Sequence, residues 1–184
     1  KGITCKVGLS GSLCPDHYFV SNIEDCMQWA KQHRYDFLIS ESAGLCNRCS
    51  PHIKTAMAVC VIDNLMGVNT PKKIGPMLKM ADIVAVTKGD IVSQAEREIF
   101  MFKIRQANPN AIIIPVNGIT GQGASELAGI LSEAAQSDTL VDKTLRVSMP
   151  TALCSYCLGE MTIGNDQQLG NARKMKLEQE ENHA

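Results

Sequence analysis

The 184-residue sequence lacks several features that define large classes of protein. No apolar run approaches the roughly 20 residues that cross a bilayer, and residues 1–20 lack the basic start and apolar block of a signal peptide. A formal net charge of -1 gives no electrostatic reason to bind nucleic acid or an anionic membrane. Aromatic residues form only 4% of the chain, which argues against stacking on bases. We therefore expect a cytoplasmic protein that binds neither nucleic acid nor membrane.

Cysteine, by contrast, is abundant. Without a secretion signal a disulfide framework is disfavoured, and two Cys-x-x-Cys pairs favour metal or redox chemistry. We expect three of the cysteines, which fall within predicted strands or helices, to be core residues. The eight are Cys5, Cys14, Cys26, Cys46, Cys49, Cys60, Cys154 and Cys157, and the three expected in the core are Cys5, Cys26 and Cys60.

Two patterns predict the secondary structure: short apolar runs bounded by turn residues indicate strands, and apolar residues at helical spacing indicate helices. The expected strands are 3–9, 36–41, 56–62, 82–87, 111–116 and 144–148. The expected helices are 18–33, with Pro15 and Asp16 at its start, then 71–79, 93–106, 124–135 and 173–181. This alternation predicts an α/β fold, doubly wound, with a mostly parallel sheet flanked by helices.

The character of the sequence changes after Gln136. Residues 1–136 carry the alternating strand and helix pattern, and we expect them to form one α/β domain. Residues 137–184 contain the second Cys-x-x-Cys pair and a polar, charged tail, and we expect a small C-terminal extension. The boundary is placed between 137 and 150.

The residues with the clearest chemistry follow predicted strands. In parallel sheets ligands bind at the carboxyl ends of the strands, where we expect the loops after Glu41, Thr87 and Val116. Glu41 ends one predicted strand and is a candidate to hold Mg²⁺ or to orient the attacking water, so it is the expected catalytic residue.

The segment Thr87-Lys88-Gly89-Asp90 closes another apolar strand. A carboxylate at Asp90 can accept hydrogen bonds from N1 and N2 of guanine, a pair of donors that adenine lacks on that edge. The stem of Lys88 can lie along the base. A strand-ending turn is the alternative reading of the same residues. The next strand ends at Asn117-Gly118, where a backbone amide can bind the guanine carbonyl oxygen.

The thiols allow more than one metal site. Cys46, Cys49, Cys154 and Cys157 together suit tetrahedral zinc or an iron–sulfur cluster. Alternatively, Cys14 and His17 join Cys46 and Cys49 in a mixed site suited to nickel or zinc. Partners outside the chain, or a redox pair, are the further alternatives. His52 is the weaker candidate, since a loop histidine is more often solvated than a ligand.

Taken together, Glu41-Ser42-Ala43-Gly44, Thr87-Lys88-Gly89-Asp90 and the run from Pro115 to Gly123 resemble the HypB and UreG family. Those proteins are GTPases that deliver nickel during hydrogenase and urease maturation. The resemblance covers about residues 14–131, and the family's Cys-Pro-His motif is similar to Cys14-Pro15-Asp16-His17 with one residue inserted. It implies a P-loop NTPase-like fold, GTP and Mg²⁺ as cofactors, a homodimer, and a client metalloenzyme or its accessory proteins as partners.

The sequence departs from that family in two respects. The phosphate loop Gly-x-x-x-x-Gly-Lys-Ser/Thr does not occur, and without it the β- and γ-phosphates lose their main support. Because the family's loop precedes the region that matches Lys1, we expect an N-terminal truncation, with a degenerate domain that hydrolyses nothing as the alternative. The second Cys-x-x-Cys pair and the pair at Cys46 and Cys49 are additions.

Two functions from different classes follow. The first is a GTP-binding, GTP-hydrolysing metallochaperone that handles nickel or a similar metal for a metalloenzyme. The second is a non-catalytic zinc or iron–sulfur module on a GTPase-derived fold, acting in assembly or electron transfer. A thiol–disulfide protein is a third reading, which a low-pKa thiol would support.

Overall fold

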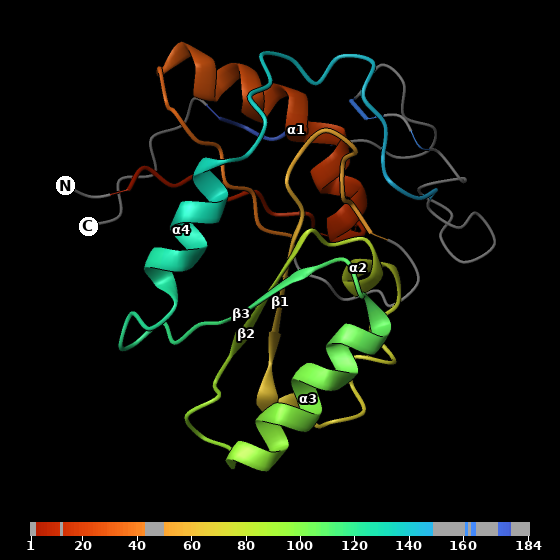
Figure 1. Ribbon diagram of the computed structural model, residues 1–184. Helices are drawn as coiled ribbons and strands as arrows, with labels where there is room; N and C mark the ends of the chain where they lie inside the picture. The colour runs from red at the N-terminus through yellow and green to blue at the C-terminus, as the bar shows by residue number, and fades with distance from the viewer. Residues whose placement is uncertain are drawn as a thin grey trace.

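A computed structural model of the chain describes residues 3–11, 13–42, 50–148, 161, 163–164 and 173–177 (Figure 1). Its helices are α1 (Pro15–Gln32), the 3₁₀ helix η1 (Asn64–Met66), α2 (Pro76–Lys79), α3 (Gln94–Ala107) and α4 (Ala124–Ser132). Its strands are β1 (Val59–Asp63), β2 (Ile83–Thr87) and β3 (Ile112–Pro115). The predicted α/β class is confirmed, and no described helix is long and apolar enough to cross a membrane.

The three strands form a parallel sheet in the order β1-β2-β3. The register pairs Val59 with Ile83 at one end of the first ladder and Asp63 with Thr87 at the other, while Val86 pairs with Pro115 in the second ladder. The middle strand β2 is buried at four of its five positions, because both of its edges and both of its faces are covered. Its continuous apolar run is the sequence signature of that position.

One face of the sheet packs against α2 and α3 (Figure 1). Leu78 from α2 and Phe100 and Ile104 from α3 are almost completely inaccessible and lie in one cluster with side chains of β1 and β2. Helix α3 begins at a capping box, in which Ser93 accepts from the Glu96 amide and the Glu96 carboxylate accepts from the Ser93 amide. The helix is therefore fixed both at its start and along its apolar stripe.

A second apolar cluster lies around α1, beyond the amino ends of the strands (Figure 1). Its buried members come from distant parts of the chain, and partly buried Leu38 packs against them. They are Val20, Ile23, Ile53, Leu140, Leu145 and Ile163. Residues of the predicted C-terminal extension thus pack on α1, while the division of the chain at 136 stays a prediction.

Two predicted strands are wrong. Residues 3–9 and 36–41 have no regular structure, and apolar side chains in both segments face solvent: Ile3 is 96% exposed and Ile39 is 81% exposed. An apolar run becomes a strand only when a neighbouring strand satisfies its backbone groups, and no described strand pairs with either segment. Among the described residues, 144–148 belong to no named strand, and Leu145 forms an isolated antiparallel bridge with Ile53.

Two predicted helices also differ from the structure. The helix expected at 71–79 contains only Pro76–Lys79, because turns occupy residues 71–73 and Gly75 has a positive φ of 69° just before the helix. Residues 173–177 of the helix expected at 173–181 are not helical. Asn22 explains this, because its side chain donates to the Arg173 carbonyl and accepts from the Met175 amide, which holds the segment against α1.

Candidate guanine-binding edge of the sheet

The two loops expected to read guanine leave neighbouring strands at the same edge. The 87–90 loop follows β2 and the 116–123 loop follows β3. The Val116 amide donates to the Val86 carbonyl at 2.8 Å, which keeps the chains paired up to the point where the loops diverge. Paired strands lie about 4.8 Å apart, so both loops border one small area. The predicted proximity of these loops is confirmed.

Lys88 is held in an unusual conformation at the start of its loop. Its φ of 56° is left-handed, which L-residues other than Asn and Asp seldom adopt. Its ammonium group forms an ion pair with Asp63 at the end of β1, with 3.0 Å between Nζ and Oδ2. The side chain therefore crosses from β2 towards β1 along the carboxyl edge of the sheet.

Two groups on these loops are available to a ligand. The Asp90 carboxylate is exposed and accepts no hydrogen bond from any residue that the structure describes. The Gly118 amide likewise has no acceptor among the described residues, and no atom lies within 4 Å of the position that a Cβ of Gly118 would take. A carboxylate and an N–H donor that have no hydrogen-bond partner in the described part of the chain thus stand on adjacent loops, at exposed positions.

Asn117 acts within its own loop. Its side-chain oxygen accepts from the Ile119 and Thr120 amides at 2.9 and 3.1 Å, and its backbone amide donates to Gln122 at 3.0 Å. Gly123 ends the loop at a φ of 77°, where a Cβ would collide with the Pro115 carbonyl. These contacts indicate that Asn117 shapes the loop, while Gly118 presents the free amide.

Glu41, the predicted catalytic residue, does not follow a strand, because 36–41 is irregular. The next residue, Ser42, donates a hydrogen bond to Asp16 in the first turn of α1, with 2.7 Å between the oxygens. The three strands end instead at Asp63, Thr87 and Pro115, and these residues mark the carboxyl edge of the sheet. A catalytic role for Glu41 stays a prediction, without the strand-end position on which it was based.

The predicted metal ligands are only partly visible. Cys14 directly precedes α1 and is half-buried, and His17 in the first turn is completely buried. Among the described residues no group of three His, Cys, Asp or Glu side chains could hold a metal ion. Cys46, Cys49, Cys154 and Cys157 lie outside the described residues.

The three cysteines expected in the core differ in how far the structure buries them. Cys60 is buried in β1, and burial raises the pKa of its thiol to about 11, as expected of a core cysteine. Cys26 is partly buried on α1, where its sulfur lies 3.8 Å from that of Met175, and burial raises its pKa. Cys5 is exposed, so its assignment to the core is wrong. The strand that would have buried Cys5 is absent from 3–9.

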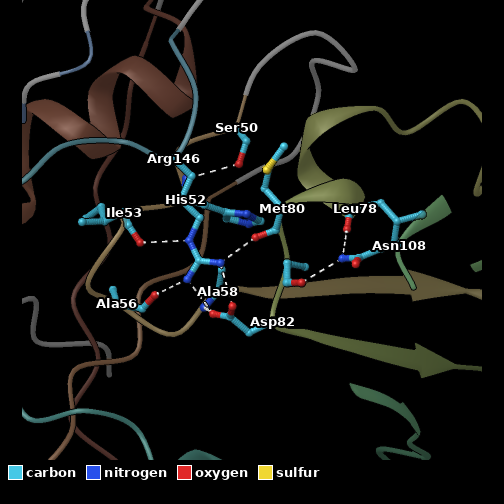
Figure 2. A network of polar contacts seen from close by, with 11 residues as sticks. Ser50, His52, Ile53, Ala56, Ala58, Leu78, Met80, Asp82, Asn108 and Arg146 are labelled. Atoms are coloured by element: carbon cyan, nitrogen blue, oxygen red, sulfur yellow. Dashed lines mark hydrogen bonds and ion pairs between the residues drawn. The ribbon is translucent and has the colours of Figure 1, made fainter. Parts of the chain in front are cut away.

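A polar network lies at the opposite end of the sheet, around Arg146 (Figure 2). Its guanidinium binds the carbonyls of Ile53, Ala56 and Met80 and both oxygens of Asp82, which directly precedes β2. Burial would raise the pKa of Asp82, but hydrogen bonds from Arg146 and from a backbone amide hold it below its ordinary value.

His52 lies beside this network and is nearly buried (Figure 2). Burial, followed by the nearby Arg146 charge, lowers the pKa of His52 to about 4. The histidine is thus neutral at physiological pH, and the expectation of a solvated loop residue is wrong. No sequence pattern links Arg146 with Asp82, 64 residues away, and sequence reasoning missed the network.

Asp63 and Asn64 are functional candidates that the sequence reasoning also missed. They directly follow the apolar run 56–62 and lie at the carboxyl end of β1. The rule that directed attention to the other strand ends applies equally to β1. Two hollows border α1, and one of them has a volume of about 510 Å³.

These features define an α/β protein whose parallel sheet presents a carboxylate and a backbone amide at its carboxyl edge. No protein-family model matches the chain. The chain is 45% identical over 174 residues to the uncharacterized protein MJ0120 of Methanocaldococcus jannaschii, an alignment that covers 95% of this chain and 74% of that protein. The chain belongs to the MJ0120 family.

A solved structure shows a more limited likeness. The hydrogenase maturation factor HypB from Archaeoglobus fulgidus is 26% identical in the aligned part, which covers 40% of this chain and 39% of that chain. The TM-score is 0.35.

Proposed function

We propose that this protein binds a guanine nucleotide at the carboxyl edge of its sheet. The observation that carries the proposal is that the Asp90 carboxylate and the Gly118 amide lie on adjacent loops at the same edge of the sheet. Among the described residues neither group has a hydrogen-bond partner, and both face open surface. A flat base that offers two donors and one acceptor along one edge complements them.

Guanine has that edge. The Asp90 carboxylate accepts hydrogen bonds from N1–H and from the exocyclic amine at N2, and the Gly118 amide donates to O6. Adenine has an unprotonated N1 and an amine in place of O6, so it leaves the carboxylate and the amide without partners. The anchored stem of Lys88 supplies an apolar surface for one face of the ring.

Metal handling is the second part of the proposal and depends on the sequence motifs. Cys14 and His17 would bind nickel or a similar metal together with Cys46 and Cys49, and the metal would be cargo for a client metalloenzyme. The resemblance of Cys14-Pro15-Asp16-His17 to the family's metal motif supports this role. The thiolate and imidazole groups support it too, because both are ligands that suit nickel or zinc.

The described residues do not fit a magnesium-dependent hydrolysis site. Glu41 is not at a strand end, and the printed sequence contains no Gly-x-x-x-x-Gly-Lys-Ser/Thr motif to hold the phosphates. The proposed activity of the described edge is recognition of the base.

Competition binding tests the proposal. A fluorescent GDP analogue would be displaced by GDP and by ADP in separate titrations. We expect GDP to compete at least tenfold better, because ADP leaves a carboxylate without its hydrogen bonds. The Asp138→Asn variant is the control, because it removes an exposed carboxylate from a loop that contacts α1 through Lys31. It should keep the wild-type preference for GDP over ADP. Equal competition by both nucleotides would refute guanine recognition.

A further inference from the structure

The end of β1 is tied to the guanine-reading loop by two side chains. The Asp63 carboxylate pairs with the Lys88 ammonium group at 3.0 Å, and the Asn64 side-chain amide donates to the Thr87 carbonyl at 2.8 Å. Thr87 is the last residue of β2, and Lys88 is the first residue of the loop that leads to Asp90. Both contacts therefore act where the loop leaves the sheet.

These contacts originate on a rigid base. Asp63 is paired in register with Thr87 in the β1–β2 ladder, and its second oxygen accepts from the Met66 amide at 3.1 Å to begin η1. Asn64 is 8% exposed, and its side-chain oxygen is buried without a hydrogen bond from any described residue. Burying an incompletely bonded amide costs free energy, which is consistent with a role other than packing.

The loop is also confined beyond Lys88. A Cβ placed on Gly89 would lie 3.2 Å from a side-chain carbon of Arg97 and 3.5 Å from the Asn64 amide nitrogen. Gly89 thus passes between the Arg97 side chain of α3 and the Asn64 side chain. Because Lys88 has a left-handed φ of 56°, contacts on both of its neighbours are needed to keep that conformation populated.

We propose that Asp63 and Asn64 are positioning residues that set base specificity by fixing the Thr87–Asp90 loop. This inference rests on the proposed guanine binding. Asp63 anchors the Lys88 ammonium group so that the stem lies across the edge of the sheet, and Asn64 fixes the loop at Thr87. Together they hold Asp90 where it reads N1 and N2 of the base.

The test is the ratio of affinities for GDP and inosine diphosphate (IDP), which lacks the N2 amine that Asp90 reads. Asp63→Asn keeps an oxygen for the Met66 amide but removes the charge, and Asn64→Ala removes the bond to Thr87. We expect the preference for GDP over IDP to fall about threefold in Asp63→Asn and about tenfold in Asn64→Ala. A loss of folded protein would lower both affinities equally and leave the ratio unchanged.

Asp25→Asn is the matched control, because it removes the Lys174–Asp25 ion pair, which is similarly exposed but lies on α1. Its ratio should equal that of the wild type. If the wild type prefers guanine while Asp63→Asn and Asn64→Ala keep the wild-type ratio, the positioning role is overturned and the proposed function stands. If the wild type does not prefer GDP over ADP, the proposed function is wrong, and the positioning role that rests on it is wrong as well. If Asn64→Ala does not fold, the nearly isosteric Asp63→Asn decides the question.

Discussion

Arg146 and Asp82 face each other in a two-armed ion pair, with Nη1 2.7 Å from Oδ1 and Nη2 2.6 Å from Oδ2. Arg146 also donates to three backbone carbonyls, while the Ala58 amide donates to Asp82. The pair joins the entry to β1, the start of β2 and the chain near 146. The pair is thus a polar connection between three chain segments at the amino end of the sheet.

Removing the guanidinium should be costly. We expect Arg146→Ala to lower the free energy of unfolding by about 3 kcal/mol, because it removes the ion pair with Asp82 and the guanidinium hydrogen bonds to three backbone carbonyls. Arg146→Lys should recover less than half, because an ammonium group cannot bind both carboxylate oxygens and the carbonyls at once. Urea denaturation measures both variants, and a fully stable lysine variant would contradict the two-armed role.

Stability should depend on pH through His52. Its folded-state pKa of about 4 lies below the unfolded value of 6.5, so between these pH values the unfolded chain binds more protons. Stability from this residue is complete above pH 6.5 and falls as the pH decreases, by about 3 kcal/mol at pH 4. Denaturation of wild type and His52→Gln at several pH values measures the effect. Equal slopes in the two proteins would show that His52 does not cause it.

Two glycines of the 117–123 loop form a matched pair. Gly121 and Gly123 both have positive φ, at 76° and 77°, but only Gly123 faces an obstacle, the Pro115 carbonyl. Gly121→Ala should cost about 1 kcal/mol from backbone strain alone. Gly123→Ala should cost clearly more and should weaken GDP binding, because β3 must shift. Thermal unfolding of the two variants provides the comparison, and equal losses would argue against the close approach.

Alkylation should separate the cysteines that the structure describes. Cys5 is exposed, whereas Cys60 is buried with a pKa raised to about 11. At neutral pH iodoacetamide should modify Cys5 quickly, while Cys60 should react only after unfolding. Peptide mass spectrometry over time measures both rates. Rapid modification of Cys60 in the folded protein would contradict its place in the core.

The sheet was largely predictable because the strands β1, β2 and β3 are apolar runs that end at turn residues. The same local pattern at 36–41 failed, because a run such as Phe37-Leu38-Ile39 does not specify its hydrogen-bond partner. In the structure Leu38 packs on the α1 cluster while Phe37 and Ile39 face solvent. Pairing is a long-range property, and periodicity within one segment does not contain it.

The candidate site likewise contains residues that the sequence predicted and contacts that it did not. Asp90 and Gly118 could be found from sequence, because each lies in the loop that follows a strand, and strand ends in a parallel sheet share an edge. The ion pair of Asp63 with Lys88 required the β1–β2 register, and that of Arg146 with Asp82 required the packing of two segments 64 residues apart. The candidate binding residues could therefore be predicted from the sequence, whereas the long-range ion pairs could not.

The most direct test of the account exchanges the hydrogen-bonding pattern at Asp90. Asn in place of Asp offers one acceptor and one donor, which suits xanthine, because xanthine carries a carbonyl where guanine has its N2 amine. We predict that Asp90→Asn loses its preference for GDP and binds xanthosine diphosphate better than GDP, by at least about tenfold. If the variant keeps the wild-type preference for GDP, Asp90 does not read the base and the proposed site is wrong.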